Sequence, residues 1–228
     1  MSSARLGVRL ARERLRGVAP LLVAVFAAAL TYALSAFNRG TDGFEAADGA
    51  LEGPVFGLIV PILAYFLVER VCDSQRLDHA VDAIARYGAD RRHVVVGLLL
   101  SSALLLALFS VVLTWLGLFA AHGGFGHDFF SDARASTGVA FLAGAVYVPW
   151  FGFASLFGPR GGGRKWALGC DFVLGAGSSA LGSPCPRGHI RNLLGGSPAL
   201  DLSQHGAWFA LLLIGALSLA LSAIRERN

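Results

Sequence analysis

Charged residues and cysteines are both scarce in this chain. Only 15% of its 228 residues are charged, whereas 55% are hydrophobic, and a soluble domain carries about 25% charged residues. The three cysteines, Cys72, Cys170 and Cys185, show neither CxxC nor Cys/His metal spacing, and their odd number excludes complete internal pairing. The composition therefore excludes a disulfide framework. It predicts a membrane protein with free thiols.

The chain also has no stretch long enough for a soluble domain between its apolar segments. The first apolar segment can cross a hydrocarbon core of about 30 Å at about 1.5 Å per residue, which indicates a retained helix and not a signal peptide. The predicted fold is all-α and polytopic, with residues 1–228 in one transmembrane domain. A basic stretch, residues 1–17, precedes six expected membrane helices, at residues 18–37, 51–68, 94–121, 137–157, 166–181 and 206–224.

The positions of the basic residues predict the orientation. Fifteen Arg and Lys residues flank one end of the six segments and only four flank the other. Because cytoplasmic loops are enriched in these residues, both termini are expected in the cytoplasm. The basic residues lie beside apolar runs and form no separate basic domain, so the net charge of +4 does not indicate nucleic acid as a partner.

The segment between the second and third apolar runs is unusually rich in charge. Residues 73–88 are expected to form a short cytoplasmic helix, because Leu77, Val81 and Ile84 recur at helical spacing and make one apolar stripe. Acids and arginines are balanced around this helix, whereas a helix that binds anionic lipid should be mainly basic. Docking to a protein partner is favoured over a helix that lies passively on the lipid surface.

Three motifs together resemble the type-2 ABC transporter permeases, the six-helix membrane subunits of ATP-driven exporters. The first is the basic start RLARERLRGVAPLLVAV, and the last is NLLGGSPAL with Ser197 and Pro198. Family members begin with a basic amphipathic helix that leads into the first membrane helix, so the resemblance implies a cytoplasmic amphipathic helix over residues 1–17. The middle motif, E-R…L…A-R-x-G-x-x-R-R…G, is matched by Glu69, Arg70, Leu77, Arg86, Gly88, Arg91, Arg92 and Gly97. The segment DSQRLDHAVDAIARYGADRR has less Thr, Leu and Glu than is usual in the family, which leaves the subfamily open.

The resemblance implies a role and a set of partners. Residues 73–88 would be the coupling helix, which docks on a separate ABC ATPase subunit that binds ATP and magnesium. This chain would then carry no cofactor and no catalytic residue, would pair with a second copy or a sister permease, and would lie among lipids of a bacterial inner membrane. The substrate stays open. The expected docking residues are Leu77, Val81, Ile84, Arg86, Gly88 and Arg91.

Two sequence features suggest other chemistry but depart from the patterns that such chemistry needs. Residues 158–166 (GPRGGGRKW) place Arg164 before the lysine and Trp166 where a phosphate loop has Ser or Thr, so a basic cytoplasmic turn is expected. Residues 175–183 resemble a rhomboid protease site, yet Ser178 is followed by another serine, and the nearest histidine to the last helix is His205 at its mouth. A membrane interaction protein without transport is a further alternative.

Two groups of ionisable residues remain. Asp171 lies within the fifth segment and is expected to pair with Arg164 or Lys165 near the interface, with a place in a substrate cavity as the alternative. An outer loop carries two histidines and two aspartates without a fixed ligand spacing, so a solvated loop is favoured over a weak metal site. These four residues are His122, His127, Asp128 and Asp132.

The charge distribution gives a direct test of topology. Single cysteines introduced at Ser2 and Asn228 should react only with reagents that reach the cytoplasm, and cysteines at Gly124 and Gly196 only with reagents added outside. Accessibility labelling of intact cells measures both. Termini on opposite sides would contradict the predicted orientation.

Overall fold

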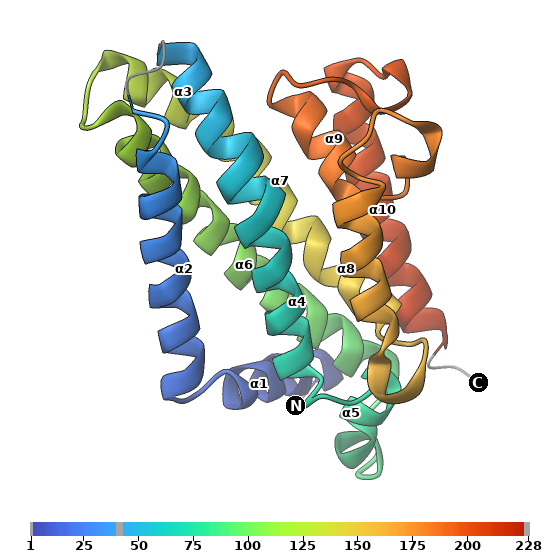
Figure 1. Ribbon diagram of the computed structural model, residues 1–228. Helices are drawn as coiled ribbons and strands as arrows, with labels where there is room; N and C mark the ends of the chain where they lie inside the picture. The colour runs from blue at the N-terminus through green and yellow to red at the C-terminus, as the bar shows by residue number, and fades with distance from the viewer. Residues whose placement is uncertain (1, 40–42, 226–228) are drawn as a thin grey trace.

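The computed structural model describes residues 2–39 and 43–225, and every regular element in these ranges is helical. Within these described ranges, five helices are long and apolar enough to cross a membrane. They form an upright bundle around the long neighbours α6 (Arg91–His122) and α7 (His127–Ala154) (Figure 1). The all-helical, membrane-like character that the composition predicted is therefore confirmed. Asn228, used in the topology test, lies outside the described residues.

Three of the predicted segments correspond closely to helices. These are α2 (Val18–Ala36), α6 and α10 (Gln204–Arg225). Helix α7 begins ten residues before the predicted segment at 137, because Phe129 and Ala133, one turn apart, are buried. The ring of Phe129 meets that of Phe119 on α6 edge to face, so part of the predicted outer loop is helical.

The second predicted segment is one span with a wide turn inside it. Helix α3 (Gly43–Ala50) leads into the π-helical turn η1 (Leu51–Ile59) and then into α4 (Val60–Val71). Pro54 lies in η1, where its ring and missing N–H disrupt ordinary α-helical bonding. A wider turn with i→i+5 bonds accommodates such a residue.

The fifth predicted segment, residues 166–181, is not one continuous helix. Helix α8 (Gly163–Val173) has 11 residues and rises only about 16 Å, about half of a hydrocarbon core. The stretch that follows contains three glycines and a proline, and these residue types disfavour a helix. Its members are Gly175, Gly177, Gly182 and Pro184. The chain resumes in α9 (Pro186–Leu193), so α8 and α9 together cover this passage in two pieces (Figure 1).

Helix α1 (Ser3–Arg14) lies across one end of the bundle, at the same end as α5 (Leu77–Ala85) (Figure 1). Two glycines let α1 approach α6 closely: a Cβ atom at Gly7 would overlap the Val94 carbonyl oxygen, and one at Gly97 would overlap the Ala4 carbonyl oxygen. Small residues at helix crossings allow this backbone approach. The remaining short elements are the 3₁₀ turns η2 (Pro159–Gly161), η3 (Ala180–Gly182) and η4 (Ala199–Asp201).

Replacing Gly97 with alanine should loosen the crossing of α1 and α6. The added methyl group has no room, so we expect Gly97→Ala to lower the free energy of unfolding by roughly 1–3 kcal/mol. Gly169→Ala, at a helical position of α8 with no atom near the new methyl group, is the matched control. It should be neutral or stabilising by up to about 1 kcal/mol. Unfolding in detergent measures both; equal effects would contradict the close crossing.

Candidate functional site

The charged segment forms helix α5, but the helix is shorter than the predicted residues 73–88. Asp73 and Ser74 have φ values of 53° and 54°, so they form a turn after α4 and do not begin the helix. The helix ends at Ala85, and Gly88, with φ of 84°, turns the chain toward α6. In Figure 1 α5 and the turn after it form the part of the molecule farthest from α3 and α9.

The apolar stripe of α5 faces the protein's own core. Leu77 and Val81 are completely buried, and Ile84 is partly buried against the same apolar cluster. Helix α5 packs against α6 through this side. The expectation that Leu77 and Val81 meet a separate ATPase subunit is therefore corrected, because a side chain with no exposed surface cannot form a docking face. Ile84 is only partly buried, and its predicted role stays a prediction.

The other side of α5 and the turn after it are open to solvent. Arg86 and Gly88 are exposed, and Tyr87 is 93% exposed although it is aromatic. Arg91, at the start of α6, is half-exposed and pairs with Asp82 at 2.8 Å. Of the six predicted docking residues, Arg86, Gly88 and Arg91 are exposed, so a partner could reach them. Tyr87 was missed, because sequence periodicity does not reveal how far a residue projects.

Helix α1 holds α5 against the end of α4. The Arg14 guanidinium donates to the backbone carbonyls of Val71 and Ala80, the latter at 2.9 Å. In return, Arg70 Nε donates to the Arg14 carbonyl oxygen at 3.0 Å. The Val71 and Arg14 carbonyls lie at the ends of α4 and α1, where helix ends leave carbonyl groups without partners. These bonds also make α1, α4 and α5 one connected unit.

A buried arginine joins α8 to the same unit. Arg164 has a side chain that is 2% exposed, and its Nε lies 3.4 Å from Glu69 Oε2 at the end of α4. Its terminal nitrogens donate to the carbonyls of Gln75 and Arg160, both at 3.2 Å. Residues 158–166 were predicted to be a basic cytoplasmic turn, and one of its guanidinium groups, that of Arg164, is buried and fixes the junction between α4, the turn before α5 and α8.

The thiol beside this arginine is inert. Cys72 is completely buried directly after α4, and burial raises its pKa to about 11, although Arg164 lowers it. A thiol of such high pKa forms little thiolate at neutral pH, and the thiolate is the reactive form. All three cysteines are free, in agreement with the sequence prediction.

Asp171 has a different set of partners from those predicted. It is completely buried and accepts hydrogen bonds from the Tyr147 hydroxyl at 2.8 Å and from the backbone N–H of Arg187 at 3.1 Å. Arg187 is in the first turn of α9, so the carboxylate satisfies an N–H that would otherwise lack an acceptor there. The predicted interfacial pair with Arg164 or Lys165 is wrong: Asp171 stabilises the break between α8 and α9.

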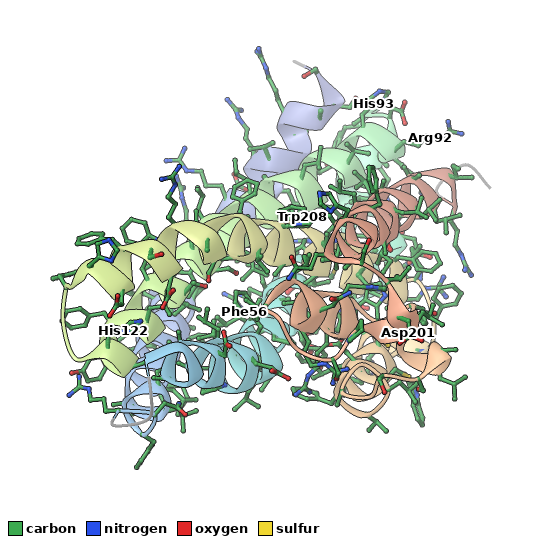
Figure 2. All side chains as sticks on the ribbon, turned by 90° about the horizontal axis from the view of Figure 1, so that it is seen from above. Phe56, Arg92, His93, His122, Asp201 and Trp208 are labelled. Carbon is green, nitrogen blue, oxygen red and sulfur yellow. The ribbon has the colours of Figure 1, made fainter. Side chains whose placement is uncertain are left out.

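The remaining candidate residues form pairs at most. His122 Nε2 lies 3.0 Å from Asp132, and His127 lies 3.6 Å from Asp128. Viewed from the end with α3 and α9, His122 is at the rim, whereas the buried Phe56 lies nearer the centre (Figure 2). Within residues 2–39 and 43–225, no three potential metal ligands gather. In the same ranges, the exposed Ser178 and Ser179 have no histidine partner, so the protease alternative gains no support.

The burial of the α5 stripe makes a stability prediction. Val81→Asp would place an unpaired charge in the core of this chain and should destabilise it by several kcal/mol. Ala83→Asp, on the exposed side of the same helix, should change stability by less than about 1 kcal/mol. Thermal unfolding of the purified protein in detergent compares the two. Equal stability of both variants would show that the stripe faces outward.

Comparison with known proteins adds no family to this description. No protein-family model matches the chain, and neither a curated protein nor a solved structure matches it significantly. The functional interpretation consequently depends on the site itself and on the motifs of the sequence.

Proposed function

We propose that this chain is the membrane subunit of an ABC exporter, and that α5 is the element that receives movement from a separate ATPase. One observation carries the proposal: α5 packs on α6 and is hydrogen-bonded to Arg14 of α1 on its inner side, and it is open on its outer side. Its apolar side is covered by the protein itself, so the open side is free for a partner. The motif residues Glu69, Arg86, Gly88 and Arg91 all lie in or beside this unit.

The proposed docking surface consists of the polar residues that point away from the bundle. A projecting tyrosine beside an arginine suits such a surface, since these residue types often dominate binding energy. This assignment keeps Arg86, Gly88 and Arg91 from the sequence prediction and replaces the buried stripe with exposed neighbours. The added residues are His79 and Tyr87.

Movement would pass from α5 to the membrane helices through the contacts described above. Arg14 ties α5 to α1 and α4, and Arg164 ties the turn before α5 to α8. A push on α5 would therefore displace several helices together. ATP and magnesium would be bound by the partner, and alternating access would need a second copy or a sister subunit, because one bundle of this size is half of such a transporter.

The arrangement of the chain ends supports a cytoplasmic place for this surface. Helix α1, α5 and the last turn of α10 lie at one end of the bundle (Figure 1). Of the eighteen Lys and Arg residues that the structure describes, fourteen flank this end by sequence position. Under the positive-inside rule it faces the cytoplasm, where an ATPase would have access to it.

The division of labour can be tested by purification. The isolated chain should hydrolyse no ATP, and a complex purified from native membranes should contain a subunit with a phosphate-binding loop and should hydrolyse ATP. Tyr87→Ala together with Arg86→Ala should weaken that association by about 30-fold or more, as expected for central interface residues. Binding of the purified ATPase subunit to the permease in detergent measures this change.

A control variant separates docking from general damage. Phe125 is 71% exposed in the turn between α6 and α7, at the opposite end of the bundle. Phe125→Ala should leave ATPase binding unchanged. Unaltered binding by the Tyr87/Arg86 variant, or ATP hydrolysis by the isolated chain, would refute the proposal.

A further inference from the structure

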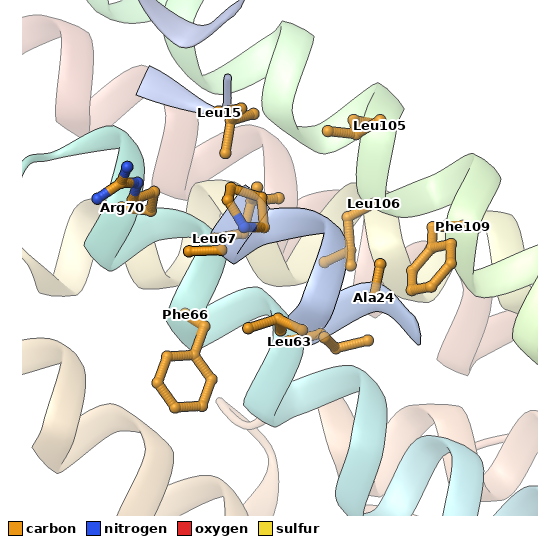
Figure 3. A pocket seen from close by; sticks show the side chains of 12 residues that line it. Leu15, Ala24, Leu63, Phe66, Leu67, Arg70, Leu105, Leu106 and Phe109 are labelled. Carbon is orange, nitrogen blue, oxygen red and sulfur yellow. The ribbon is translucent and has the colours of Figure 1, made fainter. Parts of the chain in front are cut away.

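An apolar cavity opens between α2, α4 and α6, near the end of the bundle that carries α1. It has a volume of about 310 Å³, at the lower end of the roughly 300–1,000 Å³ that ligand sites span. Figure 3 shows side chains of α4 and α6 and Ala24 of α2 around one space, with Arg70 at one side. The lining is Leu15, Ala19, Pro20, Val23, Ala24, Leu63, Phe66, Leu67, Arg70, Leu105, Leu106 and Phe109.

The cavity exists because α2 approaches the bundle at one half only. The second half of α2 buries Ala27, Thr31 and Ser35, whereas the first half stands away from α4 (Figure 1). Four residues of the first half line the cavity, and apart from Val23 they are small, so they do not fill it: Ala19, Pro20 and Ala24. Space between helices at membrane depth must be filled by something, because empty apolar volume forfeits dispersion contacts.

The chemistry of the wall limits what can fill it. Eleven of the twelve lining residues are apolar, and all of these except Leu15 come from α2, α4 and α6, whose backbone groups bond within the helix. A peptide segment would bring N–H and C=O groups that find no partners there. An acyl chain brings none, and it gains free energy for each methylene that it buries.

The single charged lining residue lies where a headgroup would be. Arg70 is exposed, and within the described residues only its Nε has a protein partner, the Arg14 carbonyl. Exposed Arg12 and Arg16 lie on either side of Arg14 in sequence and carry the same sign. Such a basic cluster attracts anionic lipid by about 1 kcal/mol per residue.

We infer that this cavity binds one acyl chain of an anionic phospholipid, with its phosphate held at Arg70. The lipid would come from the leaflet in which α1 lies. Its chain would take the place of side chains between α2 and α4, and it would set how far α2 stands from the bundle. This site is separate from the α5 docking surface and does not depend on the exporter assignment.

Native mass spectrometry of the full chain tests the site. Protein stripped of lipid with detergent would be given phosphatidylglycerol or phosphatidylcholine, and we expect one tightly retained phosphatidylglycerol molecule. Ala24→Phe should fill the cavity and reduce this retention about tenfold or more, since each methylene displaced is worth a factor of about four. Ala29→Phe, on the exposed outer side of α2, is the matched control and should retain lipid as the parent does.

Arg70→Gln tests the headgroup separately and leaves the apolar walls intact. It should remove the preference for phosphatidylglycerol over phosphatidylcholine without abolishing retention of a lipid. Full retention by Ala24→Phe, or an unchanged preference in Arg70→Gln, would overturn the inference. A loss of dimer in Ala24→Phe with lipid retention unchanged would instead assign the cavity to a second copy of the chain.

Discussion

The contact between Arg164 and Glu69 is the constraint on which the end of the bundle with α1 and α5 depends. A guanidinium with 2% exposed surface has lost most of its water, and this loss is large unless charge and hydrogen bonds replace it. The carboxylate of Glu69 supplies the charge, and the carbonyls of Gln75 and Arg160 supply the bonds. These partners belong to the end of α4, the turn before α5 and the turn before α8. Three chain segments therefore take their relative positions from one side chain.

The glycine crossing of α1 and α6 completes this frame from the other side. Gly7 and Gly97 bring the two backbones into contact, and Arg14, near the end of α1, then reaches the carbonyls of α4 and α5. Helix α5 is consequently held between α1, α6 and the Arg164 junction. A short helix is marginal in water by itself, so its stability must come from these contacts. Its outer residues remain available for a partner.

Sequence periodicity predicted helices but not what their faces contact. The spacing of Leu77, Val81 and Ile84 located α5, yet an apolar stripe has the same pattern whether it meets the chain's own core or another subunit. The membrane character followed from composition alone. The break in residues 166–181 was not predicted, although its glycines were visible, because glycine is also common in continuous membrane helices. The roles of Arg164 and Asp171 depend on residues distant in sequence, which no local pattern contains.

The two buried charges follow one physical rule. The guanidinium of Arg164 lies beside the end of α4 and the turn before α5. The carboxylate of Asp171, a residue of α8, lies at the start of α9. In both places helices end and leave backbone groups unpaired. The arginine donates to carbonyls and the aspartate accepts from an N–H, so each charge matches the backbone groups that it meets. A helix that is interrupted inside an apolar bundle needs polar side chains at the break, since water cannot reach the unpaired backbone groups there. We therefore interpret Asp171 as the residue that stabilises the break between α8 and α9, and Arg164 as the residue that fixes the start of α8 beside the turn before α5.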